Sequence, residues 1–152
     1  MTVRLTRFLT ADEVEALDQA SIAAGYYRHN PAFLTPGMGW FQPYYFDSAN
    51  PEGRRRKHGD PFLSIHYWRD WAHIRPPICI VVPNGRLWEI DRKSRNGDGW
   101  KVEGEWPNLT CSPSILLPGY HGFLRNGEFT PDVEGRGPVG VPYVQAKRPD
   151  AP

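Results

Sequence analysis

Two serines and a histidine lie within ten residues of one another and could do nucleophilic chemistry. Ser112 and Ser114 flank a proline, and His121 follows after a short apolar stretch. A histidine can take the proton of a serine hydroxyl, and an acid such as Asp91 or Asp132 could orient its ring. The chain has no Gly-x-Ser-x-Gly motif, which presents the nucleophile of many hydrolases. These residues define a candidate hydrolytic or nucleotide-binding site, which we keep as the alternative function.

A structural or ligand-facing role for the same histidine stays open. His121 lies between Tyr120 and Gly122, at the start of an expected hairpin. Its ring could bond a backbone carbonyl and hold the hairpin. It could equally face a ligand, because Gly119 and Gly122 would let another chain or a small molecule approach closely. We therefore include Tyr120 and His121 among the candidate binding residues.

The densest polar and aromatic cluster lies farther upstream. Its members are Trp68, Arg69, Asp70, Trp71 and His73. Trp, Tyr and Arg are enriched in interface hot spots, so the cluster is a candidate protein-binding site. The alternative is an edge of the core with its polar groups paired. The formal net charge of +1 argues against a dedicated nucleic-acid binder, which usually carries a marked basic excess.

The other chemistry-bearing residues give no sign of a cofactor. The five histidines are scattered, and no zinc or calcium motif occurs. Cys79 and Cys111 lie in apolar runs, so we expect small buried side chains, with a disulfide as the alternative. No secretory signal and no run of about 18 apolar residues is present. We expect no cofactor, no metal site and no membrane association.

A turn-rich β fold must position these candidates. The chain of 152 residues contains 15 glycines and 16 prolines, which excludes a helical bundle. One helix is predicted over residues 10–25, where Thr10 and Glu13 form a capping box and Gly25 ends the helix. We predict a mainly β (α+β) fold, either a small twisted antiparallel sheet or a partly closed barrel, with this N-terminal helix packed on it.

Two Asn-Gly pairs predict β-hairpins. Residues 78–82 are a continuous apolar run, typical of a central strand that is covered on both faces. Asn84-Gly85 should form an exposed turn after it, and Asn126-Gly127 should form a second turn farther along. Both residues of each turn are expected to have positive φ. In all we expect about five to seven strands, mostly antiparallel and sequential.

The sequence predicts one domain over residues 1–130 and an extended arm over residues 131–152. Within the domain, residues 26–61 are rich in aromatic residues and lack any period, so we expect an irregular segment that covers the core or contacts a partner. Proline and glycine interrupt the arm, which can be ordered only on another surface. That surface is its own domain or, as we favour, a neighbouring subunit.

One stretch shows a distinctive order of motifs. A strand with two tryptophans precedes Thr-Cys-Ser-Pro-Ser-Ile at 110–115, Tyr-His-Gly-Phe at 120–123 and an Asn-Gly turn. Over residues 66–136 the chain thus resembles a family of small, largely uncharacterised proteins encoded by bacteriophages and prophages. Related proteins often carry a Cys-rich knuckle suggestive of metal binding. This chain lacks those cysteines, so the resemblance implies a phage origin but no metal site.

These observations favour a non-enzymatic, phage-encoded binding protein that acts through protein contacts. It would be a virion accessory component or a modulator of a host system, in the host cytoplasm or incorporated in the virion. A small nucleotide-binding or hydrolytic domain is the alternative. A pocket with convergent polar groups at Ser112, Ser114 and His121 would favour that alternative, and a flat aromatic patch would favour the binding protein.

Overall fold

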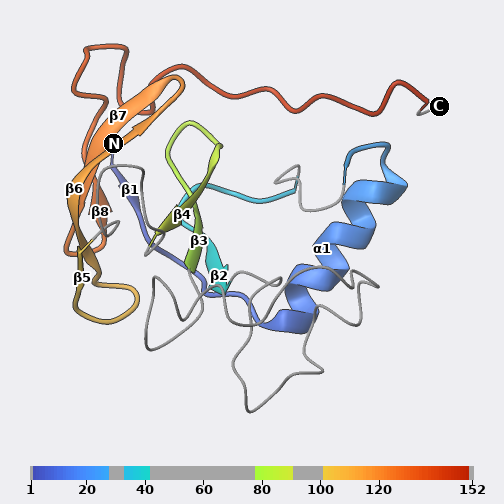
Figure 1. Cartoon of the computed structure of the whole chain (residues 1–152), viewed down its shortest axis with the longest axis horizontal. Coiled ribbons are helices and arrows are strands. Elements are labelled where there is room, and N and C mark those ends of the chain that lie inside the picture. The colour runs from blue at the N-terminus through green and yellow to red at the C-terminus, as the bar shows by residue number, and fades with distance from the viewer. Residues whose placement is uncertain (1, 28–32, 42–77, 91–100, 151–152) are drawn as a thin grey trace.

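The computed structural model describes residues 2–27, 33–41, 78–90 and 101–150, which form one helix and eight strands in two antiparallel sheets (Figure 1). The elements are β1 (Val3–Arg4), α1 (Ala11–Ala23), β2 (Gly39–Phe41), β3 (Ile78–Val81), β4 (Leu87–Ile90), β5 (Lys101–Glu103), β6 (Thr110–Leu117), β7 (Tyr120–Arg125) and β8 (Glu128–Phe129). The strand orders are β1-β8-β7-β6-β5 and β2-β3-β4. The predicted mainly β class with one helix is confirmed, and the described strands form no closed barrel.

Helix α1 begins and ends as the sequence predicts. The Thr10 hydroxyl accepts a hydrogen bond from the Glu13 N–H at 3.2 Å, and the Glu13 carboxylate accepts one from the Thr10 N–H at 2.9 Å. Gly25 follows the last turn with a φ of 93°, which favours glycine. No helix in the described ranges is long and apolar enough to cross a membrane.

The small sheet lies between the large sheet and the helix (Figure 1). Ile78, Ile80 and Val82 share one core with Leu109, which precedes β6, and with residues of the large sheet, namely Cys111, Ile115, Tyr120, Leu124 and Phe129. On the other face, Cys79 and Val81 share a second core with Leu9, Val14 and Trp40. The predicted central strand with two covered faces is confirmed, and the two cysteines are buried and are not joined in a disulfide.

The first Asn-Gly turn is less exposed than predicted. Gly85 has a φ of 92°, but Asn84 is not a positive-φ residue and is only 4% exposed. The Asn84 Nδ2 donates hydrogen bonds to the carbonyls of Pro118 and Val141, each at 3.1 Å. The prediction that Asn84 is exposed was wrong, because its amide joins this hairpin to two distant segments.

Replacing Gly85 with valine is expected to destabilise the fold by more than about 1 kcal/mol, because a β-branched residue tolerates positive φ poorly. Space is not the reason, since the atom nearest to an added Cβ is the Tyr143 carbonyl oxygen at 4.0 Å. Gly85→Asn is the matched control and should cost less, because Asn tolerates this conformation. Denaturant unfolding measures both. An unchanged midpoint for Gly85→Val would contradict the turn geometry.

The second Asn-Gly turn has the predicted form. Asn126 and Gly127 join β7 to β8, with φ values of 47° and 79°. Two positive φ angles match the right-handed twist of the flanking strands, so this turn sets a tight hairpin.

Part of the aromatic-rich segment is regular, which corrects the prediction of a wholly irregular segment. Gly39–Phe41 forms β2 and pairs with β3. A Cβ at Gly39 would lie 2.6 Å from the ring of Trp106, so the close approach of that ring requires a glycine. The strand depends on contacts with distant segments, which a search for local period does not reveal.

Strand β6 carries a bulge around Pro113. Its register against β7 shifts between Cys111 and Ile115, so residues 112–114 lie opposite Phe123 alone. Such a bulge bends a strand and redirects its side chains. Here it changes the direction of the two candidate serines.

The described part of the arm, residues 131–150, contains no strand and runs along its own domain (Figure 1). Four backbone hydrogen bonds hold it there: Val133 N–H to the His121 carbonyl at 2.8 Å, Val141 N–H to the Gly119 carbonyl at 2.8 Å, Tyr143 N–H to the Asn84 carbonyl at 2.8 Å, and Arg148 N–H to the Gly25 carbonyl at 2.7 Å. In this chain the arm therefore lies on its own domain, and its contact with a neighbouring subunit stays a prediction. The arm contacts the β6–β7 turn, then the β3–β4 hairpin, then the end of α1.

Candidate functional site

The structure brings Ser114 and His121 into contact on the hairpin β6–β7. The Ser114 Oγ lies 3.2 Å from the His121 Nε2. Ser112 lies instead opposite Lys101 of β5 and is exposed. The bulge thus separates the two serines, and only Ser114 faces the histidine.

A third side chain contacts the other ring nitrogen of this histidine. The His121 Nδ1 lies 3.4 Å from the Glu134 Oε2. Sequence analysis proposed Asp91 or Asp132 for this position. The Asp132 carboxylate instead accepts a hydrogen bond from the backbone N–H of His121 at 2.9 Å, and Asp91 lies outside the described residues. No motif in the sequence points to Glu134, because this residue lies in the arm, beyond the last strand.

The carboxylate of Asp132 organises the turn that carries Glu134. It accepts hydrogen bonds from the backbone N–H, Nε and Nη2 of Arg136, each at 2.9 Å. The Arg136 guanidinium also lies 3.2 Å from the Glu134 Oε2. Hydrogen bonds from Arg136 hold the pKa of the Asp132 carboxyl well below its usual range. The ionised Asp132 therefore fixes the position of Glu134 beside the histidine.

Replacing Asp132 with asparagine is expected to lower the melting temperature at neutral pH, because an amide cannot accept all these hydrogen bonds. The folded-state pKa of Asp132 is lowered. Its stabilisation is therefore complete above about pH 4, the usual pKa of an unfolded Asp, and is lost as the pH falls further. The difference in melting temperature between the wild type and Asp132→Asn should shrink below that pH.

Thermal melts across a pH series measure this difference. Asp150→Asn is the matched control, because the Asp150 side chain is 83% exposed in its contact with Arg148. This variant should melt close to the wild type at each pH. A difference for Asp132→Asn that widens as the pH falls would contradict the expected role of Asp132.

Tyr120 is a core residue, which corrects its choice as a binding residue. Its side chain is fully buried, its hydroxyl donates to the Thr130 carbonyl at 2.7 Å, and its ring packs edge-on against Phe129. Burial raises the pKa of Tyr120 to about 12. A Cβ at Gly122 would lie 2.6 Å from this ring, and one at Gly119 would lie 2.9 Å from the arm. At both glycines, the group that approaches the backbone closely is therefore another part of the same chain.

The upstream candidates remain predictions from the sequence. Trp68, Arg69, Asp70, Trp71 and His73 lie outside the described residues. Within the part of the chain that is described, no group of three or more His, Cys, Asp and Glu side chains is placed to hold a metal ion.

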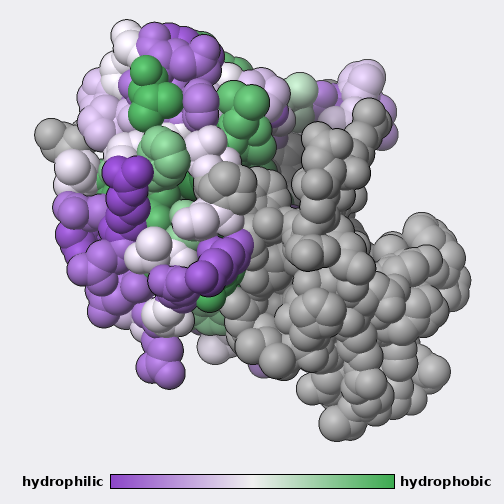
Figure 2. Space-filling view, turned by 60° about the vertical axis from the view of Figure 1, so that its left-hand side comes forward, coloured by the Kyte–Doolittle hydropathy of each residue, from purple (hydrophilic) through white to green (hydrophobic). Residues whose placement is uncertain are grey.

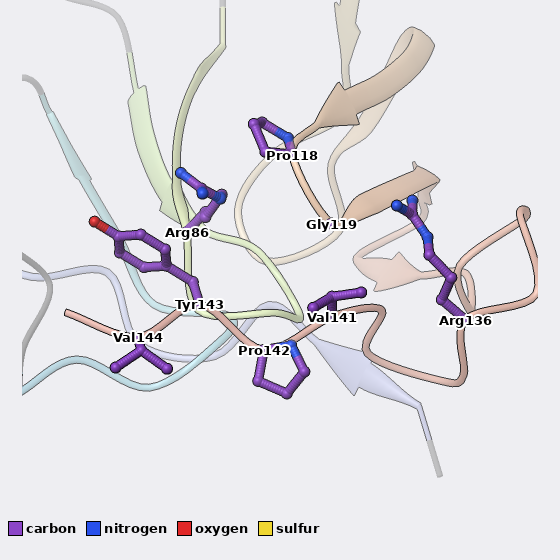
Figure 3. Close-up of a pocket in the computed structure, with 8 residues that line it drawn as sticks. All are labelled: Arg86, Pro118, Gly119, Arg136, Val141, Pro142, Tyr143 and Val144. Carbon is purple, nitrogen blue, oxygen red and sulfur yellow. The ribbon is translucent and has the colours of Figure 1, made fainter.

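A hollow of about 560 Å³ lies where the arm crosses the β6–β7 turn (Figure 3). It is lined by Arg86, Pro118, Gly119, Arg136, Val141, Pro142, Tyr143 and Val144. The Arg86 guanidinium lies over the ring of Tyr143, 4.2 Å from its centroid, and Arg136 lies at the far side of the hollow. No sequence signal marks this hollow, because it exists only once the arm lies against the hairpins.

Apolar side chains remain exposed around the hollow and the histidine. Figure 2 shows hydrophobic and hydrophilic residues interspersed over the described part of one face, without a broad flat patch. The large exposed residues nearby are Leu116, Val133, Val141, Tyr143 and Val144. They form small apolar areas beside polar groups, which is typical of a groove rather than of a flat interface.

No protein-family model, no curated protein and no solved structure matches the chain. The resemblance to phage proteins thus rests on the order of motifs alone.

Proposed function

We propose that the protein is a binding protein that acts through protein contacts, and that the hollow in Figure 3 holds an extended segment of its partner. The observation that supports this most directly is the exposure of the arm beside the hollow. Val141 is 52% exposed, Tyr143 37% and Val144 83%. Apolar side chains left exposed around a concave surface mark sites of interaction, because covering them removes apolar area from water.

The charge at the hollow indicates what such a segment must carry. Arg86 stacks on Tyr143, and no carboxylate pairs with it among the described residues. Covering an unpaired guanidinium is costly unless the partner supplies an acceptor, and a carboxylate can accept two of its hydrogen bonds at once. The segment therefore combines apolar residues with an Asp or Glu.

Selection of a random peptide library on the immobilised protein tests this proposal. Peptides enriched on the wild type should combine apolar residues with an acid, and Val144→Asp should abolish their binding. Val133→Asp is the matched control, because Val133 is 51% exposed but does not line the hollow. No enrichment, or equal binding to the Val144→Asp variant, would reject the hollow as a binding site. Circular dichroism and thermal melting show whether both variants are folded.

The resemblance over residues 66–136 supports a finer proposal, that the protein is phage-encoded and its partner belongs to the virion or to a host system. Mass spectrometry of purified virions separates these two roles. A constant number of copies per particle would indicate a virion accessory component. Absence from particles that retain their known structural proteins would indicate a host-directed role in the host cytoplasm.

The alternative, a nucleotide-binding or hydrolytic domain around Ser112, Ser114 and His121, has one observation in its favour. Ser114 and His121 are in hydrogen-bond contact. The hollow in Figure 3 is not lined by any of the three residues, so it gives this alternative no pocket.

A further inference from the structure

The geometry points to Ser114 as a nucleophile, activated by His121, that can accept an acyl group from an ester. This activity goes beyond protein binding and uses different residues from the hollow. The Ser114 Oγ lies 3.2 Å from the His121 Nε2, at the long end of hydrogen-bond reach. Contacts of this length are usual before a substrate is bound and tighten in its complex.

The two neighbours of the histidine ring favour the tautomer that this chemistry needs. The Glu134 Oε2 lies 3.4 Å from Nδ1, on the side of the ring away from Ser114. A carboxylate at Nδ1 favours a proton on that nitrogen and leaves Nε2 free to accept the proton of the serine hydroxyl. Glu134 also stabilises the imidazolium that then forms. Glu134 contacts the histidine and the Arg136 guanidinium and acts on Ser114 through the histidine, so it is a positioning residue.

Each member of this group is fixed by a separate element. Ser114 lies in the bulge of β6, His121 lies in β7, and Glu134 lies in the turn that Asp132 and Arg136 hold together. The His121 side chain is 28% exposed and that of Glu134 is 51% exposed, so a small molecule can reach the group from solvent. A preorganised group that remains accessible is what nucleophilic catalysis requires.

The surroundings indicate the class of ester. Leu116 pairs with His121 in register and is 67% exposed. The N–H of Val133 donates to the His121 carbonyl at 2.8 Å, and Val133 is 51% exposed. Two exposed apolar side chains thus flank the histidine. They suit a short uncharged acyl group, which loses contact with water when it lies against them.

The reaction balances without a cofactor. The Ser114 Oγ bonds to the ester carbonyl carbon as its proton passes to His121 Nε2. The alcohol then leaves with that proton, and the acyl group stays on Ser114. Water attacks the acyl carbon and gives a proton to His121, and the acid departs as the proton returns to Ser114. The sum is an ester and water giving an acid and an alcohol.

An alkyl fluorophosphonate added to the full-length protein tests this inference, since such probes bond covalently to activated serines. Peptide mass spectrometry should locate one adduct, at Ser114. Ser114→Ala should abolish it, and His121→Gln should slow it at least about 100-fold. Ser112→Ala is the matched control and should label at the wild-type rate. p-Nitrophenyl butyrate should be hydrolysed by the wild type and not by Ser114→Ala.

The pH dependence separates an activated serine from a purely structural network. A general base acts only in its deprotonated form, so the labelling rate should rise with pH in the wild type. Glu134→Gln should slow labelling and displace this rise, which a merely structural role would not do. If His121→Gln does not fold, the pH dependence of labelling in Glu134→Gln tests the inference instead. The inference would be overturned by the absence of an adduct, by an adduct elsewhere, or by equal ester hydrolysis by Ser114→Ala. A labelling rate that is independent of both pH and these substitutions would also overturn it.

Discussion

Replacing Ile80 with alanine is expected to lower the free energy of unfolding by about 3 kcal/mol, the middle of the range for buried Ile-to-Ala changes. Ile80 is fully buried in β3, opposite Gly39 on one side and Trp88 on the other. Its side chain belongs to the core between the two sheets. The paired strands hold the backbone on both sides, so the cavity cannot collapse and most of the cost remains.

Urea unfolding measures this loss of unfolding free energy, and two further variants serve as comparisons. Ile80→Val removes one methylene at the same place and should cost about 1 kcal/mol. Val144→Ala removes more, but from a side chain that is 83% exposed, and should cost nearly nothing. A loss below about 1 kcal/mol for Ile80→Ala would mean that the sheets do not enclose this residue.

Deleting residues 137–152 is expected to lower the free energy of unfolding by about 2 kcal/mol, or the melting temperature by roughly 4–8 °C. The deletion removes the bonds of the arm to Gly119, Asn84 and Gly25. It also removes the Arg148 guanidinium, which donates to the carbonyls of Ile22 and Tyr26. Each hydrogen bond contributes about 1 kcal/mol, and the conformational entropy regained by the free arm offsets part of the total.

Thermal melting and light scattering of the truncated and full-length proteins, side by side, measure this effect. Asn84→Ala is a narrower variant, because it removes one side-chain amide, which bonds the Pro118 and Val141 carbonyls and accepts from the Arg86 N–H, and should cost about 1–2 kcal/mol. An unchanged melting temperature, together with loss of a dimer or larger assembly, would contradict this expectation and support the hypothesis that the arm binds a neighbouring subunit.

The features that the sequence predicts correctly depend on a few adjacent residues. The capping box at Thr10 needs only Glu13, and the turn at Asn126-Gly127 needs only two residues that tolerate positive φ. The apolar run at 78–82 marks a central strand, because both of its faces must be covered. Such signals are local, so they can be recognised without knowledge of the rest of the fold.

The features that the sequence does not predict depend on segments that meet only in the folded chain. Asn84 is buried because the arm and the β6–β7 turn both bond its side chain. Tyr120 is buried because strands alternate, and its register places the ring inward rather than toward a partner. Ser114 and His121 were predicted as a pair, but their acid is Glu134, since the turn after β8 folds back onto β7.

The order in which the chain is synthesised has a consequence for the arm. Residues 131–150 follow all the described strands in the sequence, yet they supply Glu134 to the histidine and five residues to the lining of the hollow, namely Arg136, Val141, Pro142, Tyr143 and Val144. Both sheets can therefore be translated, and can begin to pair, before either candidate site exists. Cleavage between the last strand and this arm would leave a β-sheet scaffold with neither the hollow nor the group around Ser114. Both candidate sites therefore depend on an intact backbone at this one exposed connection.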